Sequence, residues 1–242
     1  MKPEKIEPLF AGWQETMVWS YLQGCMGWAM ADNEEAPQSA QIVLGDFCFF
    51  AGVPDESLIA RAGAPILVPR NAAWDEAMGR VLAGKAERRL RYAIRKEPGV
   101  FDRERLRALA RVPEPYCLRA FDQELYHQAM GESWSRDFCA LFDVMEDFLK
   151  RGVGFGVLDR GILVAGAASY SVYRGGIEIE IDTRPDYRRQ GLASACGAAL
   201  ILACLERNLY PSWDAYDLRS VALAEKLGYH SDRPYPVYIL KD

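Results

Sequence analysis

The chain has 242 residues, of which half are hydrophobic and about a quarter charged, and its formal net charge at pH 7 is −5. These values are ordinary for a globular protein, and the acidic balance argues against a general nucleic-acid binder, which is usually basic. No apolar run approaches the roughly 20 residues that a membrane-spanning helix needs. We therefore expect neither nucleic acid nor a membrane as a partner.

Cysteine and histidine usage argues against a metal site. The six cysteines are scattered without a C-x-x-C pair, and there are only two histidines, so no metal ligand cluster is predicted. Cys196 and Cys204 fall in an apolar helical segment, where buried, reduced thiols are expected. Reduced thiols, together with an N-terminus (MKPEKIEP) too acidic and polar for a secretory signal, predict a cytoplasmic protein.

The first 113 residues are predicted to form a small α/β domain, in which we find no functional signature. Apolar residues at helical spacing within 6–30 predict a helix. The segment 41–51, QIVLGDFCFFA, is interpreted as one buried strand, and Asp55 as the cap of a short helix. The other elements expected here are a strand over 66–68, a helix over 71–82, a strand with one solvent-facing side over 88–96 and a helix over 101–111.

The proline-rich segment 111–116, RVPEPY, is the best candidate boundary, and we predict domains over 1–113 and 114–242. The expected elements after it are a strand over 116–120, a helix from Gln123 capped by Asp122, a helix over 135–150, strands over 153–158 and 162–172 joined by a turn at 159–161, a strand over 177–183, and a last strand over 237–240 preceded by Pro234 and Pro236.

The segment 176–207 carries the strongest functional signal. Residues 177–183 alternate isoleucine with glutamate or aspartate before a final threonine, the period of a half-buried strand, and Pro185 ends that strand. The basic turn RRQGLA over 188–193 then leads into a helix from Gly191. Free N–H groups and the positive end of a helix dipole, together with two arginines, form an anion site suited to a pyrophosphate.

The hexapeptide RRQGLA fits the R/Q-x-x-G-x-G/A signature of the GNAT (Gcn5-related N-acetyltransferase) family. The segment LYPSWDA (209–215) sits where this family has its fifth strand, and DLRSVALAEKLGY (217–229) resembles the helix that follows. The motif resemblance covers roughly residues 176–229 and is closest to a bacterial subgroup with a long N-terminal α/β extension. It implies an α/β fold in which a mixed sheet flanked by helices follows a smaller α/β domain.

The resemblance also implies acetyl-CoA as co-substrate. Backbone groups near Ile181 and Thr183 would pair with the pantetheine arm as an added strand does. The residues that would hold the pyrophosphate are Arg188, Arg189, Gln190, Gly191, Leu192 and Ala193. Asp217 stands where the family usually has an asparagine that contacts the pantetheine arm, and Ser220 keeps the family's small hydroxyl. An ionised aspartate cannot donate a hydrogen bond, which puts that contact in doubt.

Acetyl transfer to an amine requires a base, because only the deprotonated amine attacks the thioester. Glu180, with Glu178 one step deeper, shares a strand face and is the candidate general base. The alternative is that this face is merely solvated, or that Asp182 on it selects a cationic substrate. The family's usual proton-donating tyrosine corresponds to Ala224 here, so no general acid is assigned.

The resemblance predicts an N-acetyltransferase that moves an acetyl group from acetyl-CoA to a primary amine by direct attack in a ternary complex. A small-molecule amine is favoured as the acceptor, because no groove for a large polymer is evident. Two alternatives remain: a sensor or interaction module that binds acetyl-CoA without turnover, which the departures at Asp217 and Ala224 favour, and an acyltransferase acting on a protein amine. The sequence leaves a homodimer open.

Overall fold

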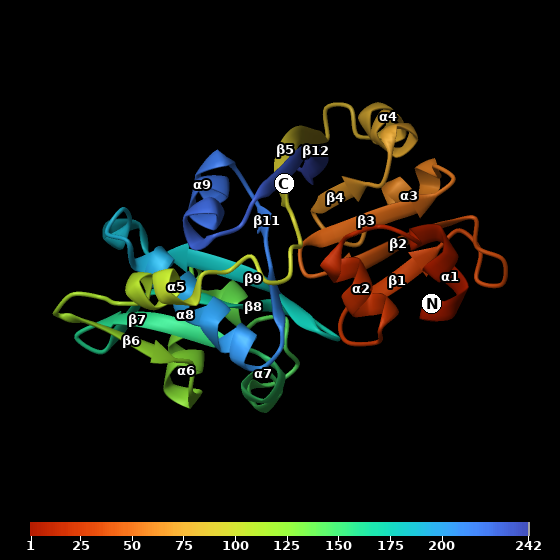
Figure 1. Cartoon of the computed structure of the whole chain (residues 1–242). Helices are drawn as coiled ribbons and strands as arrows, with labels where there is room; N and C mark the ends of the chain where they lie inside the picture. Colours follow the sequence, from red (N-terminus) through yellow and green to blue (C-terminus); the bar gives the residue numbers. More distant parts are fainter. Residues whose placement is uncertain (242) are drawn as a thin grey trace. The chain divides into compact units, whose positions relative to one another are not determined.

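The chain divides into two compact units. The computed structural model describes residues 1–241, and its first unit combines residues 1–92 with the segment from Pro234, while the second is Ala93–Arg233 (Figure 1). The chain therefore passes between the units within two strands, β5 (Ala86–Ile94) and β12 (Ser231–Leu240). The predicted boundary between residues 113 and 114 lies inside the second unit. The division of function between two domains stays a prediction.

The first unit is built on a sheet in which the strands follow one another in the order β1-β2-β3-β4-β12-β5. Phe50, Leu67, Trp74 and Met78 are buried together in its core. The other elements of this unit are the helices α1 (Pro3–Phe10), α2 (Thr16–Leu22), α3 (Glu56–Ala60) and α4 (Ala72–Val81), and the strands β1 (Trp28–Ala31), β2 (Ser39–Leu44), β3 (Phe47–Gly52) and β4 (Ile66–Pro69).

Residues 41–51 form a hairpin, so the prediction of a single buried strand is wrong. Strands β2 and β3 pair antiparallel up to Leu44 and Phe47, and the chain reverses at Gly45, whose φ is 56°, and Asp46. All of β2 and nearly all of β3 are buried, so both strands are apolar without alternation and the break between them is hidden. The Gly-Asp dipeptide, a common two-residue hairpin turn, was the signal.

The predicted helix starts in this unit are confirmed. The side chain of Asp55 accepts a hydrogen bond from the backbone N–H of Leu58 at 2.8 Å and caps α3. Asn71 caps α4 in the same way, accepting from Trp74 N–H at 3.1 Å. These short polar side chains satisfy N–H groups that a helix leaves unpaired at its start.

The last strand begins earlier than predicted and contains both prolines. Strand β12 starts at Ser231 rather than at Val237. Its pairing with β4 involves Tyr238 and Ile239, which lie beyond Pro234 and Pro236. A proline lacks the N–H that a ladder uses, so the strand tolerates both residues where β4 does not pair with it.

Helix α4 is tied to the sheet through Asp75. The carboxylate accepts two hydrogen bonds from Arg88 on β5, at 3.0 and 2.8 Å, and one from the hydroxyl of Tyr238 on β12, at 2.7 Å. The hydrogen bond from Arg88 holds the pKa of Asp75 below its ordinary value. A group whose pKa is lower in the folded chain stabilises the fold in its ionised form.

We predict that Asp75→Asn lowers the free energy of unfolding at pH 7 by about 1 kcal/mol, a modest loss because Arg88 is half exposed. Since the folded pKa is depressed, the stabilisation is present above the unfolded pKa of about 3.9 and is lost as the pH falls through the folded value. Urea unfolding from pH 7 to pH 3 should show the two proteins converging below about pH 4.

The control for this variant is Glu76→Gln on the exposed side of the same helix, where Glu76 pairs with Arg80. This change should leave stability within a few tenths of a kcal/mol. If Asp75→Asn lowers the free energy of unfolding as much at pH 3 as at pH 7, the ionised carboxylate of Asp75 is not the stabilising group.

The second unit is built on a five-stranded mixed sheet with the order β10-β9-β8-β7-β6. Strand β9 pairs parallel with β10 and antiparallel with β8. The predicted fold class, α/β with a mixed sheet flanked by helices, is confirmed. The helices are α5 (Arg103–Leu109), α6 (Gln123–Gly131), η1 (Arg136–Phe138), α7 (Met145–Arg151), η2 (Pro185–Tyr187), α8 (Leu192–Glu206) and α9 (Leu218–Leu227), and the strands are β6 (Tyr116–Ala120), β7 (Gly154–Asp159), β8 (Ile162–Tyr173), β9 (Gly176–Thr183), β10 (Tyr210–Ser212) and β11 (Asp214–Ala215).

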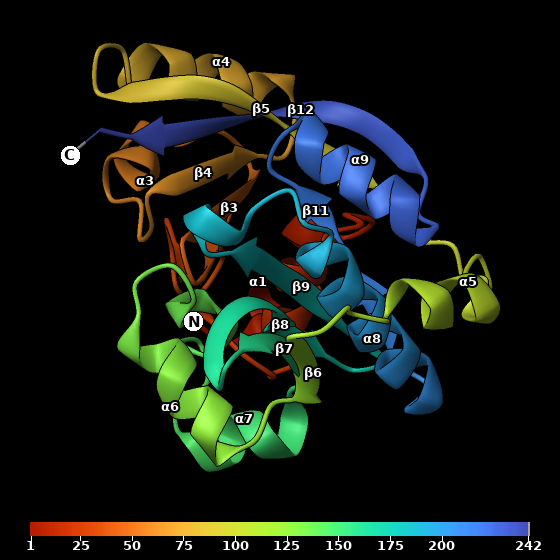
Figure 2. The same cartoon turned by 90° about the vertical axis from the view of Figure 1, so that its left-hand side faces the viewer.

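The isoleucine side chains and the carboxylate side chains of β9 lie on opposite faces of the sheet of the second unit. A Cβ on Gly197 of α8 would lie 3.3 Å from Cδ1 of Ile181, so the isoleucine face of β9 packs on α8. On the other face, Gly166 lies opposite Asp182, and a Cβ there would lie 2.5 Å from Cε2 of Phe138. In Figure 2, α8 lies on one side of the sheet and α6 and α7 on the other. The carboxylates of β9 therefore belong to the side away from α8.

Helix α8 is buried over most of its length, and it contacts β7, β8, β9, α5 and α9. Cys196 and Cys204 are fully buried and free, as predicted, and burial raises the pKa of each thiol to about 12. Such thiols remain protonated and unreactive. The packed apolar helix therefore holds its own N-terminus, and the loop that leads into it, in place.

The single helix predicted over 135–150 is wrong, because only η1 and α7 form there and Val144 between them is extended. Phe138 and Phe148 both pack against the ring of Phe121, with ring centroids 6.1 and 5.7 Å away. A continuous α-helix would separate these two residues by about 15 Å along its axis. The break lets both rings reach the same partner.

Candidate active site

Strands β9 and β10 pair over only three residues and then diverge. The paired residues run from Gly176 opposite Tyr210 to Glu178 opposite Ser212, where β10 ends, whereas β9 continues to Thr183. Strand β8 stays paired with β9 on the other side up to Thr183. Residues 179–183 thus have an edge that β10 does not cover, and backbone N–H and C=O groups on such an edge can bind an extended, amide-containing ligand.

The divergence follows from a break in the segment predicted as one strand over 209–215. Two short strands form instead, and of these only β10 pairs, in parallel, with β9. Trp213 lies between them, is 4% exposed, and donates its indole N–H to Ser220 Oγ at 3.1 Å. The anchored side chain therefore stands directly after Ser212, the last residue that pairs with β9.

The loop after β9 ends at the N-terminus of α8. Gly191 is the N-cap, with a left-handed φ of 82°, and no side chain caps the helix. Its carbonyl accepts from Ala195 N–H at 3.2 Å, so the N–H groups of Leu192, Ala193 and Ser194 precede the intrahelical ladder. The open N–H groups and the dipole of a 15-residue helix together favour a bound anion.

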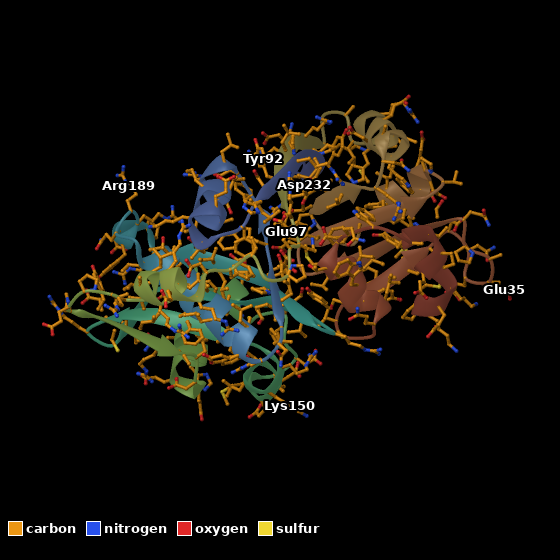
Figure 3. All side chains as sticks on the ribbon, viewed as in Figure 1. Glu35, Tyr92, Glu97, Lys150, Arg189 and Asp232 are labelled. Atoms are coloured by element: carbon orange, nitrogen blue, oxygen red, sulfur yellow. The ribbon has the colours of Figure 1, made fainter. Side chains whose placement is uncertain are left out.

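The two loop arginines are held differently. Arg188 donates from Nε to Thr183 O at 3.0 Å and forms an ion pair with Asp182 at 3.3 Å. Arg189 has a left-handed φ of 62° and is exposed, and Figure 3 shows its side chain pointing away from the ribbon. The ion pair means that Asp182 serves the loop, which weakens the idea that it selects a cationic substrate.

Glu178 and Glu180 lie at different points of the divergence. Glu178 is 5% exposed and stands opposite Ser212 at the last paired position, so its part of the face is not solvated. Glu180 is half-buried and is the first carboxylate beyond that position. Next to Glu178, burial raises the pKa of Tyr173 to about 12, although the hydrogen bond with Ser212 acts against the rise.

Asp217 and Ser220 already have partners within α9 and beside it. Asp217 caps the helix, accepting from the N–H groups of Arg219 and Ser220 at 2.9 and 3.0 Å, and also pairs with the Arg219 guanidinium. Partial burial acts to raise the pKa of Asp217, but these hydrogen bonds outweigh it and the pKa lies below its ordinary value. The roles predicted for both residues toward the pantetheine arm stay predictions.

The position at which this family usually has a proton-donating tyrosine is buried here and carries no such group. Ala224 is fully buried. Tyr229 is also buried, donates its hydroxyl to Pro211 O at 2.6 Å, and burial raises its pKa well above the ordinary value. Neither residue offers a proton-transfer group at the open edge of β9.

Two pairs near the site were not predicted. The hydroxyl of Tyr173 lies 3.0 Å from Ser212 Oγ, and that of Tyr116 donates to Gln190 Oε1 at 2.6 Å. Both pairs join residues far apart in sequence that the arrangement of the sheet brings together, so no local motif predicts them.

The described residues bring together no group of three or more histidine, cysteine or acidic side chains suited to a metal ion. They also form no helix with the length and apolar character needed to cross a membrane.

The diverging parallel strands and the glycine-capped helix are the arrangement that the resemblance to N-acetyltransferases of the GNAT family implies for this segment. A family model described as GNAT acetyltransferase matches residues 7–238, and the chain belongs to this family. The predicted family is therefore confirmed, and the match extends over both units, far beyond the motifs of residues 176–229.

Individual relatives agree with this assignment. The chain is 25% identical, in an alignment 242 positions long, to YdfB of Bacillus subtilis (strain 168), named an uncharacterised N-acetyltransferase, with 92% of this chain and 89% of YdfB covered. A crystal structure of a GCN5-related N-acetyltransferase-like protein from Streptococcus suis is 43% identical, with a TM-score of 0.95 over 99% of this chain and 98% of the other. A GCN5-related N-acetyltransferase from Kribbella flavida, 15% identical, shares the fold, with a TM-score of 0.57 over 94% of this chain and 95% of its own.

The cap of α9 gives a prediction that needs no ligand. Asp217→Ala should lower the free energy of unfolding by about 1 kcal/mol, whereas Asp217→Asn should cost only a few tenths, because asparagine caps a helix as well as aspartate does. The ion pair with Arg219 adds little, since Arg219 is 89% exposed. Urea unfolding at pH 7 measures both, and equal losses in the two variants would refute the capping role.

Proposed function

We propose that this chain transfers the acetyl group of acetyl-CoA to the primary amine of a small molecule, by direct attack in a ternary complex. The observation that supports the proposal most is the divergence of β9 and β10 directly ahead of the glycine-capped N-terminus of α8. The open strand edge suits an amide-rich arm, and the helix start suits a pyrophosphate. Both parts of CoA have a matching surface in one unit of the chain.

The residues we propose for CoA binding form two groups. Backbone groups of Ile181 and Thr183 on the open edge would pair with the pantetheine arm. Leu192 and Ala193 would offer their N–H groups to the pyrophosphate, while Arg189 supplies a charge that can move onto the phosphate. The remaining members of the proposed set are Arg188 and Gln190, which shape the loop, Gly191, which lets the backbone approach closely, and Asp217 and Ser220.

Glu180 is proposed as the general base. An ammonium acceptor must lose a proton before its nitrogen can attack the thioester carbonyl. Glu180 would take that proton directly or through a water, and the C–N bond forms as the C–S bond breaks. The nitrogen then loses a second proton, which reaches the departing CoA thiolate through water, and the products are the acetamide and CoA thiol. Glu180 is favoured over Glu178 because it is half-buried and lies beyond the last β10 pair, where the edge is open. Glu178, a second carboxylate deeper on the same strand face, would raise the pKa of Glu180 because the two carry like charges.

A second candidate function is a sensor or interaction module that binds acetyl-CoA without turnover. The buried Ala224 in place of a proton donor, and the engagement of Asp217 with its own helix, favour it. Release of free thiol from acetyl-CoA in the presence of a panel of small amines separates the two. A third candidate, transfer to a protein amine, predicts release with peptides but not with small amines.

We expect Glu180→Gln to lower kcat at pH 7 by at least tenfold and to leave the Kd of acetyl-CoA within about twofold, because glutamine cannot accept the proton. Thiol-release kinetics and calorimetric titration measure the two quantities. Glu206→Gln, at the exposed end of α8, is the control and should leave both unchanged. A full kcat in Glu180→Gln would exclude Glu180 as the base.

The loop assignment predicts a specific effect of Gly191→Val. A β-branched residue is strained at the φ of 82°, so the N–H groups should turn away from the pyrophosphate and the Kd of acetyl-CoA should rise more than tenfold. Gly175→Val is a matched control, because Gly175 also has a left-handed φ, of 95°, and open space around it but lies in the turn before β9. Equal Kd values in the two variants would show that the loop does not bind the pyrophosphate.

A further inference from the structure

The loop between β9 and α8 is attached to the far side of the sheet by two tyrosines. Tyr116, the first residue of the edge strand β6, donates its hydroxyl to Gln190 Oε1 at 2.6 Å. Tyr187, within the loop, donates its hydroxyl to Asp159 Oδ2 at the end of β7, at 2.8 Å. The loop thus has one contact to each of the two strands farthest from β9 in the sheet order.

The two anchors form one connected cluster. The rings of Tyr116 and Tyr187 pack edge to face, with centroids 6.3 Å apart and an interplanar angle of 74°. The guanidinium of Arg184 lies 4.7 Å from the ring centroid of Tyr187 and pairs with Asp186 at 2.7 Å. Edge-to-face rings and a cation over a ring are both favourable, so the contacts support each other.

The loop needs such support because of its backbone. Arg189 and Gly191 are both left-handed, with φ of 62° and 82°. Glycine adopts this conformation freely, but for arginine it is unfavourable, because Cβ comes too close to the following carbonyl. Gln190, whose side chain Tyr116 holds, stands between these two residues. The hydrogen bond between Tyr116 and Gln190 therefore holds the chain next to Arg189, whose unfavourable left-handed conformation could otherwise change.

We propose that Tyr116 is a positioning residue for the phosphate-binding loop. By holding Gln190, it keeps the backbone around Arg189 and Gly191 in the conformation that presents the N–H groups of α8 to an anion. The ligand, the pyrophosphate of CoA, rests on the proposed function. Without the anchor the loop must be ordered when the ligand binds, and that ordering weakens binding.

The test is Tyr116→Phe, which removes the hydroxyl and leaves the ring that packs on Tyr187. We expect the Kd and KM for acetyl-CoA to rise about fivefold, the worth of one hydrogen bond, with kcat at saturation unchanged. Gln190→Met should have the same effect, and the double variant should be no weaker than either single one, because both changes break the same contact.

A second readout requires no ligand. Arg188 and Arg189 are exposed and are trypsin sites, so a loop released from its anchor should be cut there several times faster in the folded protein. Tyr238→Phe is the control, because it removes a hydroxyl bonded at 2.7 Å to Asp75 in the other unit. It should leave the Kd, the KM and the cleavage rate at these two sites unchanged.

The outcomes separate the two proposals. If the wild-type chain binds no acetyl-CoA, the proposed function fails, and the cleavage rate still decides whether Tyr116 holds the loop. If the wild type binds and Tyr116→Phe binds equally well, the positioning role is overturned and the proposed function stands. Additive losses in the double variant, or equal cleavage rates in wild type and Tyr116→Phe, also overturn it.

Discussion

The site depends on a strand that is paired along one edge and largely released along the other. Strand β9 keeps β8 as a neighbour from end to end, but its pairing with β10 ends at Glu178, opposite Ser212 and directly before the buried Trp213. An uncovered edge exposes backbone hydrogen-bonding groups, which proteins usually protect. Here the strand leads into the start of a helix, and under the proposed function the uncovered edge is the surface that binds the pantetheine arm.

The two faces of β9 have separate tasks. One face packs on α8, where Gly197 allows close contact with Ile181, and this contact fixes the helix start relative to the open edge. The opposite face carries the carboxylates, with Asp182 committed to the loop through Arg188 and Glu180 left at the edge. Under the proposed function, packing, anion binding and proton transfer fall on different sides of one short strand, and each can be altered separately.

Local signals predicted much of this arrangement. Each of these signals spans only a few neighbouring residues: the alternation over 177–183, the glycine before α8, and the caps at Asp55 and Asp122. The hairpin over 41–51 was missed although its turn signal is local. The helix expected over 135–150 failed where distant contacts decide, because Phe138 and Phe148 both pack against Phe121. The tyrosine anchor of Gln190 likewise depends on the order of strands in the sheet, which no local pattern encodes.

The most direct measurement is amide hydrogen exchange of the whole chain with and without acetyl-CoA. If the open edge and the helix start bind the co-substrate, protection should appear at residues 179–183 and 191–194, the groups that would pair with the pantetheine arm and the pyrophosphate. Little change is expected at residues 176–178, which already pair with β10. Saturating acetyl-CoA that protects other segments, or none, would contradict the account.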